Sequence, residues 1–95
     1  MSKKVFLCGI GGSGMSALAR YFLSENYEVF GSDIGNSAIT DSLEKEGVIF
    51  FNEQKSENIT ENNFDLFVYT EAIPDTNPEL KTAIEKKIEI KNILK

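Results

Sequence analysis

Glycines near the amino terminus have the spacing of a phosphate-binding loop. Gly9, Gly11 and Gly14 form the pattern G-x-G-x-x-G, and Gly12 is an additional glycine within it. Glycines permit a sharp turn and let the backbone approach a ligand without an intervening side chain. Where such a loop opens a helix, unpaired amide groups and the helix dipole favour a negatively charged phosphate. The pattern therefore predicts a site for a nucleotide-type diphosphate.

One acidic residue and one missing motif narrow this chemistry. Asp33 ends the second apolar run, where a carboxylate can accept hydrogen bonds from ribose hydroxyls. The loop lacks the G-K-[S/T] ending of triphosphate-binding loops, so it predicts no phosphate-bound magnesium. The pattern does not separate NAD from another nucleotide diphosphate. Purely structural roles also stay open: Gly9 and Gly14 could serve only strand–helix packing, and Asp33 could be a solvated acid.

The segments that position these residues alternate between strand and helix patterns. The first helix, residues 13–25, follows the glycine loop directly, and Asn26 is expected to end it. Asp41 followed by Glu44 resembles the capping signal of a short helix that Gly47 ends. A polar stretch with one helical turn at most is expected over residues 52–63. Strands are predicted over residues 4–8, 28–32, 48–51, 65–69 and 89–92.

The last helix has the clearest start. Asn77 is a capping residue, Pro78 suits the first helical position, and Glu79 places an acid in the first turn. The apolar face of this helix is expected to comprise Leu80, Ala83, Ile84 and the stem of Lys87; that of the first helix comprises Met15, Leu18, Ala19, Phe22 and Leu23. The alternation predicts a Rossmann-like α/β fold with a doubly wound, parallel five-stranded sheet. Right-handed crossovers then give the strand order 3-2-1-4-5.

Composition excludes several classes of function. The 95 residues suffice for one domain, and 41% of them are hydrophobic. The formal net charge is -5 without a basic stripe, which argues against nucleic-acid and membrane-surface partners. Histidine is absent and Cys8 is the only cysteine, so we expect no catalytic Ser–His or Cys–His pair and no metal site. Without a signal peptide or a long apolar run, the cytoplasm is the expected location.

Several motifs together resemble the amino-terminal part of the Mur ligase family, in particular its L-alanine-adding branch. The run from Gly9 to Ala19 is similar to the glycine loop of that family. The run from Val29 to Asp33 is similar to its second strand, and the spacing of Thr40, Leu43 and Gly47 fits its T-x-x-L-x-x-x-G helix. The runs 69–73 and 77–80 resemble a fourth-strand motif and the helix after it. The resemblance covers essentially the whole chain.

The resemblance implies a function for residues 1–95 as a UDP-sugar-binding domain. Such a ligase joins L-alanine to UDP-N-acetylmuramate, with ATP and Mg²⁺ bound by a central domain and a carboxyl-terminal domain following in cis. Those domains are absent from these residues, so the chain by itself is expected to hold the nucleotide sugar without catalytic residues or a cofactor of its own. The residues expected to contact the UDP part are Gly11, Gly12, Ser13, Gly14, Met15, Ser32, Asp33, Thr70, Ala72 and Ile73.

Two short stretches depart from the family pattern, and three competing functions stay open. Glu53 and Gln54 stand where the family usually has Gly-His near the substrate, and Glu71 follows Thr70 where the family has Ser-Ser. A ligase that recycles murein peptides would share this domain. The NAD-binding domain of an oxidoreductase is a second possible function, and an interaction module that has lost binding is a third. The run from Gly11 to Ser16 and the Asn77-Pro78-Glu79 block favour a Mur ligase over the last two.

Overall fold

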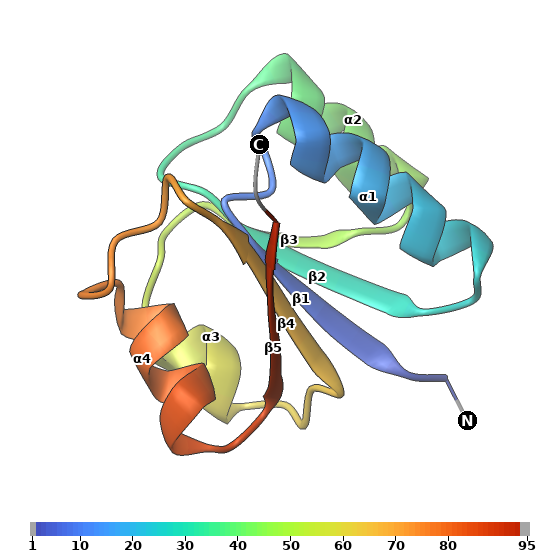
Figure 1. The fold of residues 1–95 in the computed structure, drawn as a ribbon. Coiled ribbons are helices and arrows are strands. Elements are labelled where there is room, and N and C mark those ends of the chain that lie inside the picture. The colour runs from blue at the N-terminus through green and yellow to red at the C-terminus, as the bar shows by residue number, and fades with distance from the viewer. Residues whose placement is uncertain (1, 94–95) are drawn as a thin grey trace.

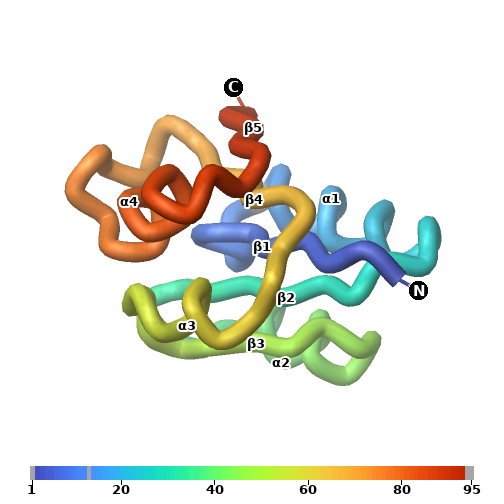
Figure 2. The backbone as a smooth tube through the Cα atoms, turned by 90° about the horizontal axis from the view of Figure 1, so that it is seen from below, coloured from blue at the N-terminus to red at the C-terminus, as the bar shows by residue number. Residues whose placement is uncertain are grey.

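The computed structural model describes residues 2–93, apart from the side chain of Ser13. The described strands all run parallel in the order β3-β2-β1-β4-β5, which Figure 2 shows from bottom to top. This confirms the predicted fold class and strand order. In chain order the elements are β1 (Lys4–Cys8), α1 (Ser13–Ser24), β2 (Glu28–Ser32), α2 (Ala38–Glu46), β3 (Ile49–Phe51), α3 (Glu57–Thr60), β4 (Leu66–Thr70), α4 (Pro78–Glu85) and β5 (Glu89–Ile93).

The helices cover both faces of the sheet (Figure 1). Helices α1 and α2 lie on one face and α3 and α4 on the other, so the sheet separates two apolar clusters. The strands alternate between these clusters: Val5 and Leu7 face α1, whereas Phe6 faces α4. The ring of Phe6 stacks on that of Phe67, with centroids 5.6 Å apart. Because β1 is central and buried on both faces, its sequence is a continuous apolar run.

The local sequence predicts the end of α1 correctly, but not the start of α2. Asn26 follows α1 with a φ of 67°, as expected of a residue that ends a helix in the left-handed region. The predicted capping role of Asp41 and Glu44 is wrong. Ser37 caps α2 instead: its hydroxyl accepts from the amide of Thr40, whose hydroxyl in turn accepts from the amide of Ser37. The helix therefore begins one turn earlier than the acids suggested.

Helix α4 begins as predicted but faces the core differently. The Asn77 side chain accepts hydrogen bonds from the amides of Glu79 (2.9 Å) and Leu80 (3.2 Å), and Pro78 occupies the first turn. Ile84, expected on the apolar face, is 57% exposed, and Lys87 is exposed beyond the end of the helix, whereas Glu79 is completely buried. The helix is oriented so that its first-turn acid points into the protein beneath the edge of the sheet, where polar groups form hydrogen bonds with it.

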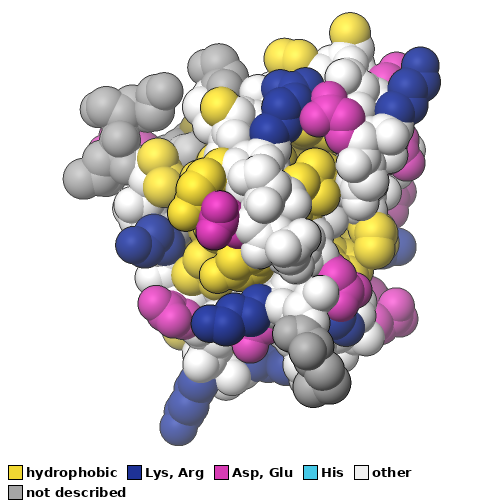
Figure 3. Space-filling model, turned by 90° about the vertical axis from the view of Figure 1, so that its right-hand side faces the viewer, with side chains coloured by type: hydrophobic (Ala, Val, Ile, Leu, Met, Phe, Trp, Pro, Cys, Tyr) yellow, Lys and Arg dark blue, Asp and Glu magenta, His cyan; other side chains and the backbone are white. Residues whose placement is uncertain are grey.

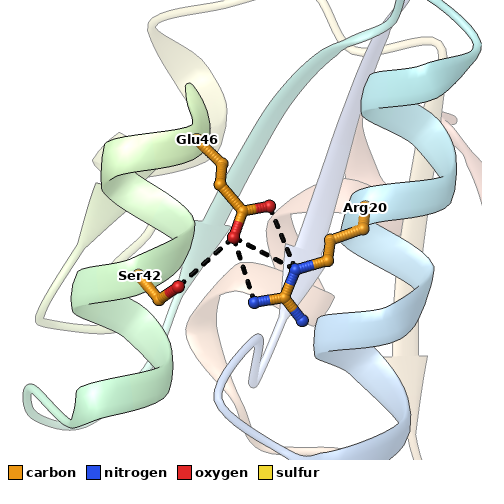
Figure 4. Close-up of polar contacts among 3 residues, drawn as sticks. All are labelled: Arg20, Ser42 and Glu46. Atoms are coloured by element: carbon orange, nitrogen blue, oxygen red, sulfur yellow. Dashed lines mark hydrogen bonds and ion pairs between the residues drawn. The ribbon is translucent and has the colours of Figure 1, made fainter.

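An ion pair fastens α1 to α2 on the surface (Figure 4). The Arg20 guanidinium donates to both carboxylate oxygens of Glu46, at 3.0 to 3.2 Å, and the Ser42 hydroxyl donates to the same carboxylate. The hydrogen bond from Arg20 lowers the pKa of Glu46. Since both side chains are well exposed, solvent screens the pair and it contributes little to stability.

The described surface carries charges of both signs. On the face drawn in Figure 3, basic and acidic side chains are intermixed around apolar ones, without a broad basic patch. Helix α1, with 12 residues, is the longest in the described part of the chain. None of the described helices is long and apolar enough to cross a bilayer.

Candidate functional site

A cleft of about 510 Å³ opens at the carboxyl edge of the sheet. It lies where the strand order changes direction, between β1 and β4, which is the usual binding position in open α/β sheets. The glycine loop after β1 and the turn after β4 form its opposite walls. Its lining residues are Gly9, Gly12, Gly14, Met15, Asp33, Ile34, Gln54, Thr70, Glu71, Ala72, Ile73, Pro74 and Ile93.

The glycine loop is tied to the end of the neighbouring strand. The amides of Gly9 and Ile10 both donate to the carbonyl of Ser32, each at 2.9 Å. Gly9 has a φ of 80°, a backbone conformation that residues with side chains rarely adopt. A Cβ there would also lie 3.2 Å from Cδ1 of Ile73 on the opposite wall. Gly9 thus provides both the turn and the narrow approach between the two walls.

At Gly12, the backbone of the loop is exposed to the cleft at the start of α1. It is the residue before the helix and has ordinary extended angles (φ -68°, ψ 153°). A Cβ on Gly12 would meet Gly9 O at 3.5 Å and Met15 Cγ at 3.9 Å, both ordinary contacts. Within a helix the first amides, such as that of Gly14, have no carbonyl of a preceding turn to pair with. Backbone donors and the positive end of the α1 dipole therefore border the cleft at this point.

Asp33 connects the end of β2 to the loop. Its Oδ2 accepts from the Gly11 amide at 2.8 Å, and its Oδ1 accepts from the Ile34 amide at 2.8 Å. Gly11 itself borders a smaller neighbouring pocket of about 230 Å³ on the far side of Asp33. Asp33 is therefore a brace of the glycine loop as well as a lining residue of the cleft.

The turn after β4 forms the second wall. The Ile73 amide donates to the Thr70 carbonyl at 3.0 Å, and the Ala72 amide donates to the Thr70 hydroxyl at 3.3 Å. These bonds orient the turn so that Ala72 and Ile73 present apolar surface to the cleft. Glu71 is exposed at the rim. Among the described side chains that line the cleft, none belongs to lysine or arginine. The positive end of the α1 dipole borders the cleft instead.

The structure brings together most of the predicted contact residues. Gly12, Gly14 and Met15 line the cleft from one side, with Asp33 beside them and Thr70, Ala72 and Ile73 opposite. Gly11 borders the adjoining pocket, and Ser13 begins α1, although its side chain lies outside the described residues. The Ser32 side chain is completely buried and lies beneath the cleft, where its hydroxyl donates to Glu79.

Sequence reasoning missed Gln54 and the apolar rim residues Ile34 and Ile93. Gln54 reaches the cleft from the loop after β3, while its neighbour Glu53 faces away and pairs with Lys55 at 3.6 Å. The only sequence signal for Gln54 was its place in the family pattern. The rim residues carried none, because isolated isoleucines next to strand ends also occur in cores.

The sequence profile of the Mur ligase family, catalytic domain, matches residues 4–95. This chain belongs to the Mur ligase family. The UDP-N-acetylmuramate–L-alanine ligase of Clostridium beijerinckii is 50% identical over 86 residues, which are 90% of this chain and 18% of that protein. Against curated relatives of this kind, the chain spans about a fifth of their length.

Solved structures agree with this membership. The crystal structure of the UDP-N-acetylmuramate-alanine ligase MurC from Thermotoga maritima matches with a TM-score of 0.88 at 36% identity, over 94% of this chain and 20% of the other. A UDP-N-acetylmuramate:L-alanyl-gamma-D-glutamyl-meso-diaminopimelate ligase from Neisseria matches with a TM-score of 0.85 at 19% identity, over 97% of this chain and 29% of the other. The second likeness shows the shared fold alone.

Proposed function

We propose that this chain is the amino-terminal domain of an L-alanine-adding Mur ligase and that it holds the UDP part of UDP-N-acetylmuramate. The observation that carries the proposal is the cleft, whose glycine wall is open backbone at a helix start. A diphosphate suits this wall because its oxygens can accept from amides that the helix leaves unpaired. The named relatives favour a Mur ligase over an oxidoreductase domain or an interaction module.

Within this proposal, each wall has a task. The Gly14 amide at the start of α1 donates to the diphosphate, and Gly12, whose own amide donates to the Gly9 carbonyl at 3.1 Å, leaves room for it. Asp33 keeps the loop in shape while facing the nucleoside. Thr70, Ala72 and Ile73 close the cleft from the other side. Because a UDP-activated sugar and ATP are cytoplasmic metabolites, the proposal also assigns the chain to the cytoplasm.

ATP and Mg²⁺ do not fit the part of the chain that the structure describes. The described residues contain no group of three or more Asp, Glu, His or Cys side chains that could hold a metal ion, and the glycine loop lacks the lysine of a triphosphate loop. We therefore assign ATP and Mg²⁺ to the remainder of the ligase, in cis, and no catalytic step to these residues.

The experiment is a pair of amide-NMR titrations of the ¹⁵N-labelled chain, one with UDP-N-acetylmuramate and one with NADH. The proposal expects shifts with the sugar nucleotide alone, confined to the loop at 9–15, to Asp33 and to the turn at 70–73. Shifts with NADH alone would overturn it in favour of an oxidoreductase domain.

Two variants sharpen the titration. Gly12→Val places a branched side chain on the glycine wall, where the backbone accepts a Cβ without strain, so binding should be lost while the fold is kept. Ala17→Val is the matched control, since Ala17 is exposed on the same helix and does not line the cleft. Equal affinities of the Gly12 variant and the parent would remove the glycine wall from the site.

A further inference from the structure

A buried carboxyl group lies beneath the cleft. Glu79 is completely buried although it stands in the first turn of a helix, where an exposed acid would serve the helix dipole equally well. Its Oε1 accepts from the Ser32 hydroxyl at 2.5 Å and faces the Cys8 thiol at 3.3 Å. Its Oε2 accepts from Asn58 Nδ2 at 2.6 Å and from the Lys55 amide at 3.2 Å.

These donors come from four different segments of the chain. Cys8 ends β1, Ser32 ends β2, Lys55 belongs to the loop after β3, and Asn58 lies in α3. Burial raises the pKa of Glu79, and the donated hydrogen bonds oppose that effect. Burying an acid without a cation beside it is costly, so a task beyond interaction with the helix dipole is expected of this side chain.

The Ser32 hydroxyl links Glu79 to the cleft and determines which group donates in each hydrogen bond of that link. A carboxylate accepts only, so the single hydroxyl proton of Ser32 is directed to Glu79. The Ser32 oxygen is then left as an acceptor for Gln54 Nε2, which lies 3.4 Å from it. Gln54 Nε2 also donates to Cys8 Sγ at 3.5 Å. On its other side, Gln54 Oε1 accepts from Asn77 Nδ2 at 3.0 Å. These contacts determine which end of the Gln54 carboxamide is the NH₂ group and which is the oxygen.

We propose that Glu79 is a positioning residue of the cleft: through the Ser32 hydroxyl, its carboxylate orients the Gln54 carboxamide. One N–H of the Gln54 NH₂ group is directed at Ser32 and Cys8, and the other is offered as a donor to an acceptor oxygen of the bound nucleotide sugar. This inference rests on the proposed function, because Gln54 lines the cleft assigned to that ligand. Glu79 does not touch the ligand itself.

Glu79→Gln tests the direction of the chain of hydrogen bonds while preserving its shape. A glutamine at this position can donate to Ser32, which frees the Ser32 proton to point toward Gln54 and removes the preference for one orientation of the carboxamide. Gln54→Ala deletes the contact itself. Glu85→Gln is the matched control, because Glu85 is an exposed acid of the same helix.

Affinities for UDP-N-acetylmuramate are measured by calorimetry for the parent, the single variants and Glu79→Gln/Gln54→Ala. Loss of one neutral hydrogen bond predicts that Gln54→Ala and Glu79→Gln each bind about five- to tenfold more weakly. Because both changes remove the same contact, the double variant should bind no more weakly than Gln54→Ala. The Gln54 side-chain NH₂ signals should also shift or broaden in Glu79→Gln without ligand, and remain unchanged in Glu85→Gln.

The possible failures are distinguishable. If the parent does not bind UDP-N-acetylmuramate, the proposed function is wrong and this inference falls with it. If the parent binds and Glu79→Gln binds equally well, or if the losses multiply in the double variant, only the positioning role is overturned. Should Glu79→Gln fail to fold, Ser32→Ala breaks the same link while leaving Glu79 its remaining donors, and the same outcomes decide.

Discussion

Replacing Gly31 with alanine should destabilise the fold through a contact between β2 and the glycine loop. A Cβ on Gly31 would lie 2.4 Å from Cδ1 and 2.9 Å from Cβ of Ile10, and 3.0 Å from the Leu7 carbonyl oxygen. Non-bonded carbons prefer separations of about 3.5–4.0 Å. Ile10 is completely buried and Leu7 belongs to the central strand, so neither can withdraw freely.

The magnitude follows from overpacking in a closed core. Such insertions cost about 1–3 kcal/mol, which for a domain of this size lowers the melting temperature by roughly 4–24 °C. Thermal unfolding followed by circular dichroism, with urea titration beside it, measures both quantities. Gly12→Ala is the matched control, because a Cβ on Gly12 meets its neighbours only at ordinary distances. A Gly31→Ala variant as stable as Gly12→Ala would refute the reasoning.

A second substitution identifies the partner in this contact. Ile10→Val deletes Cδ1, the atom that the new methyl group would approach most closely. Alone it should cost about 0.5–1.5 kcal/mol. Combined with Gly31→Ala, the total loss of stability should be smaller than the sum of the single losses by at least about 0.5 kcal/mol. Strict additivity would show that the strain lies elsewhere.

Three further outcomes are expected. Asn77→Ala should cost about 1–2 kcal/mol in urea unfolding because α4 loses its cap, whereas Thr76→Ala, an exposed neighbour, should be neutral. Burial raises the pKa of Glu79 above its ordinary value of 4.5, so ionisation of this side chain opposes folding. The parent should therefore lose stability relative to Glu79→Gln as the pH rises from 4.5 through the raised pKa. Parallel curves of unfolding free energy against pH for the two proteins would contradict this. Finally, affinity for UDP-N-acetylmuramate should fall only slightly between about 0.01 M and about 0.15 M salt, because salt screens the α1 dipole but no described lysine or arginine lines the cleft. A steep fall would reveal a cation at the ligand.

The sequence predicted the sheet well because its signals were redundant. The apolar run of β1, the glycines after it and the amphipathic pattern of α1 each indicated the same unit, and crossover handedness then determined the strand order. The boundaries of the elements were predicted less accurately. Strand β4 runs one residue later than predicted, since Asp65 precedes it and its carboxylate accepts from the Lys4 amide.

Most of the candidate site was predictable for the same reason, whereas its floor was not. Loops at the carboxyl ends of parallel strands share one edge, so Asp33 and Thr70 were placed near the glycine loop without knowledge of any contact. Sequence cannot tell which way a helix turns its first-turn acid, because an acid suits the dipole whether it faces solvent or core. Glu79 was therefore predicted only as a first-turn acid, and its link to Gln54 through Ser32 could not be foreseen.

The acids of the site also explain how a cleft without described cationic side chains suits a diphosphate. Asp33 accepts two backbone amides, and Glu79 accepts four donors below the floor, so both carboxylates are engaged by the protein. Of the acids at the cleft, Glu71 alone is exposed at the rim, where solvent screens it. The formal charge of the chain is therefore a poor guide to the potential in the cleft, which depends on the direction of N–H groups. At the start of α1 that direction favours an anion.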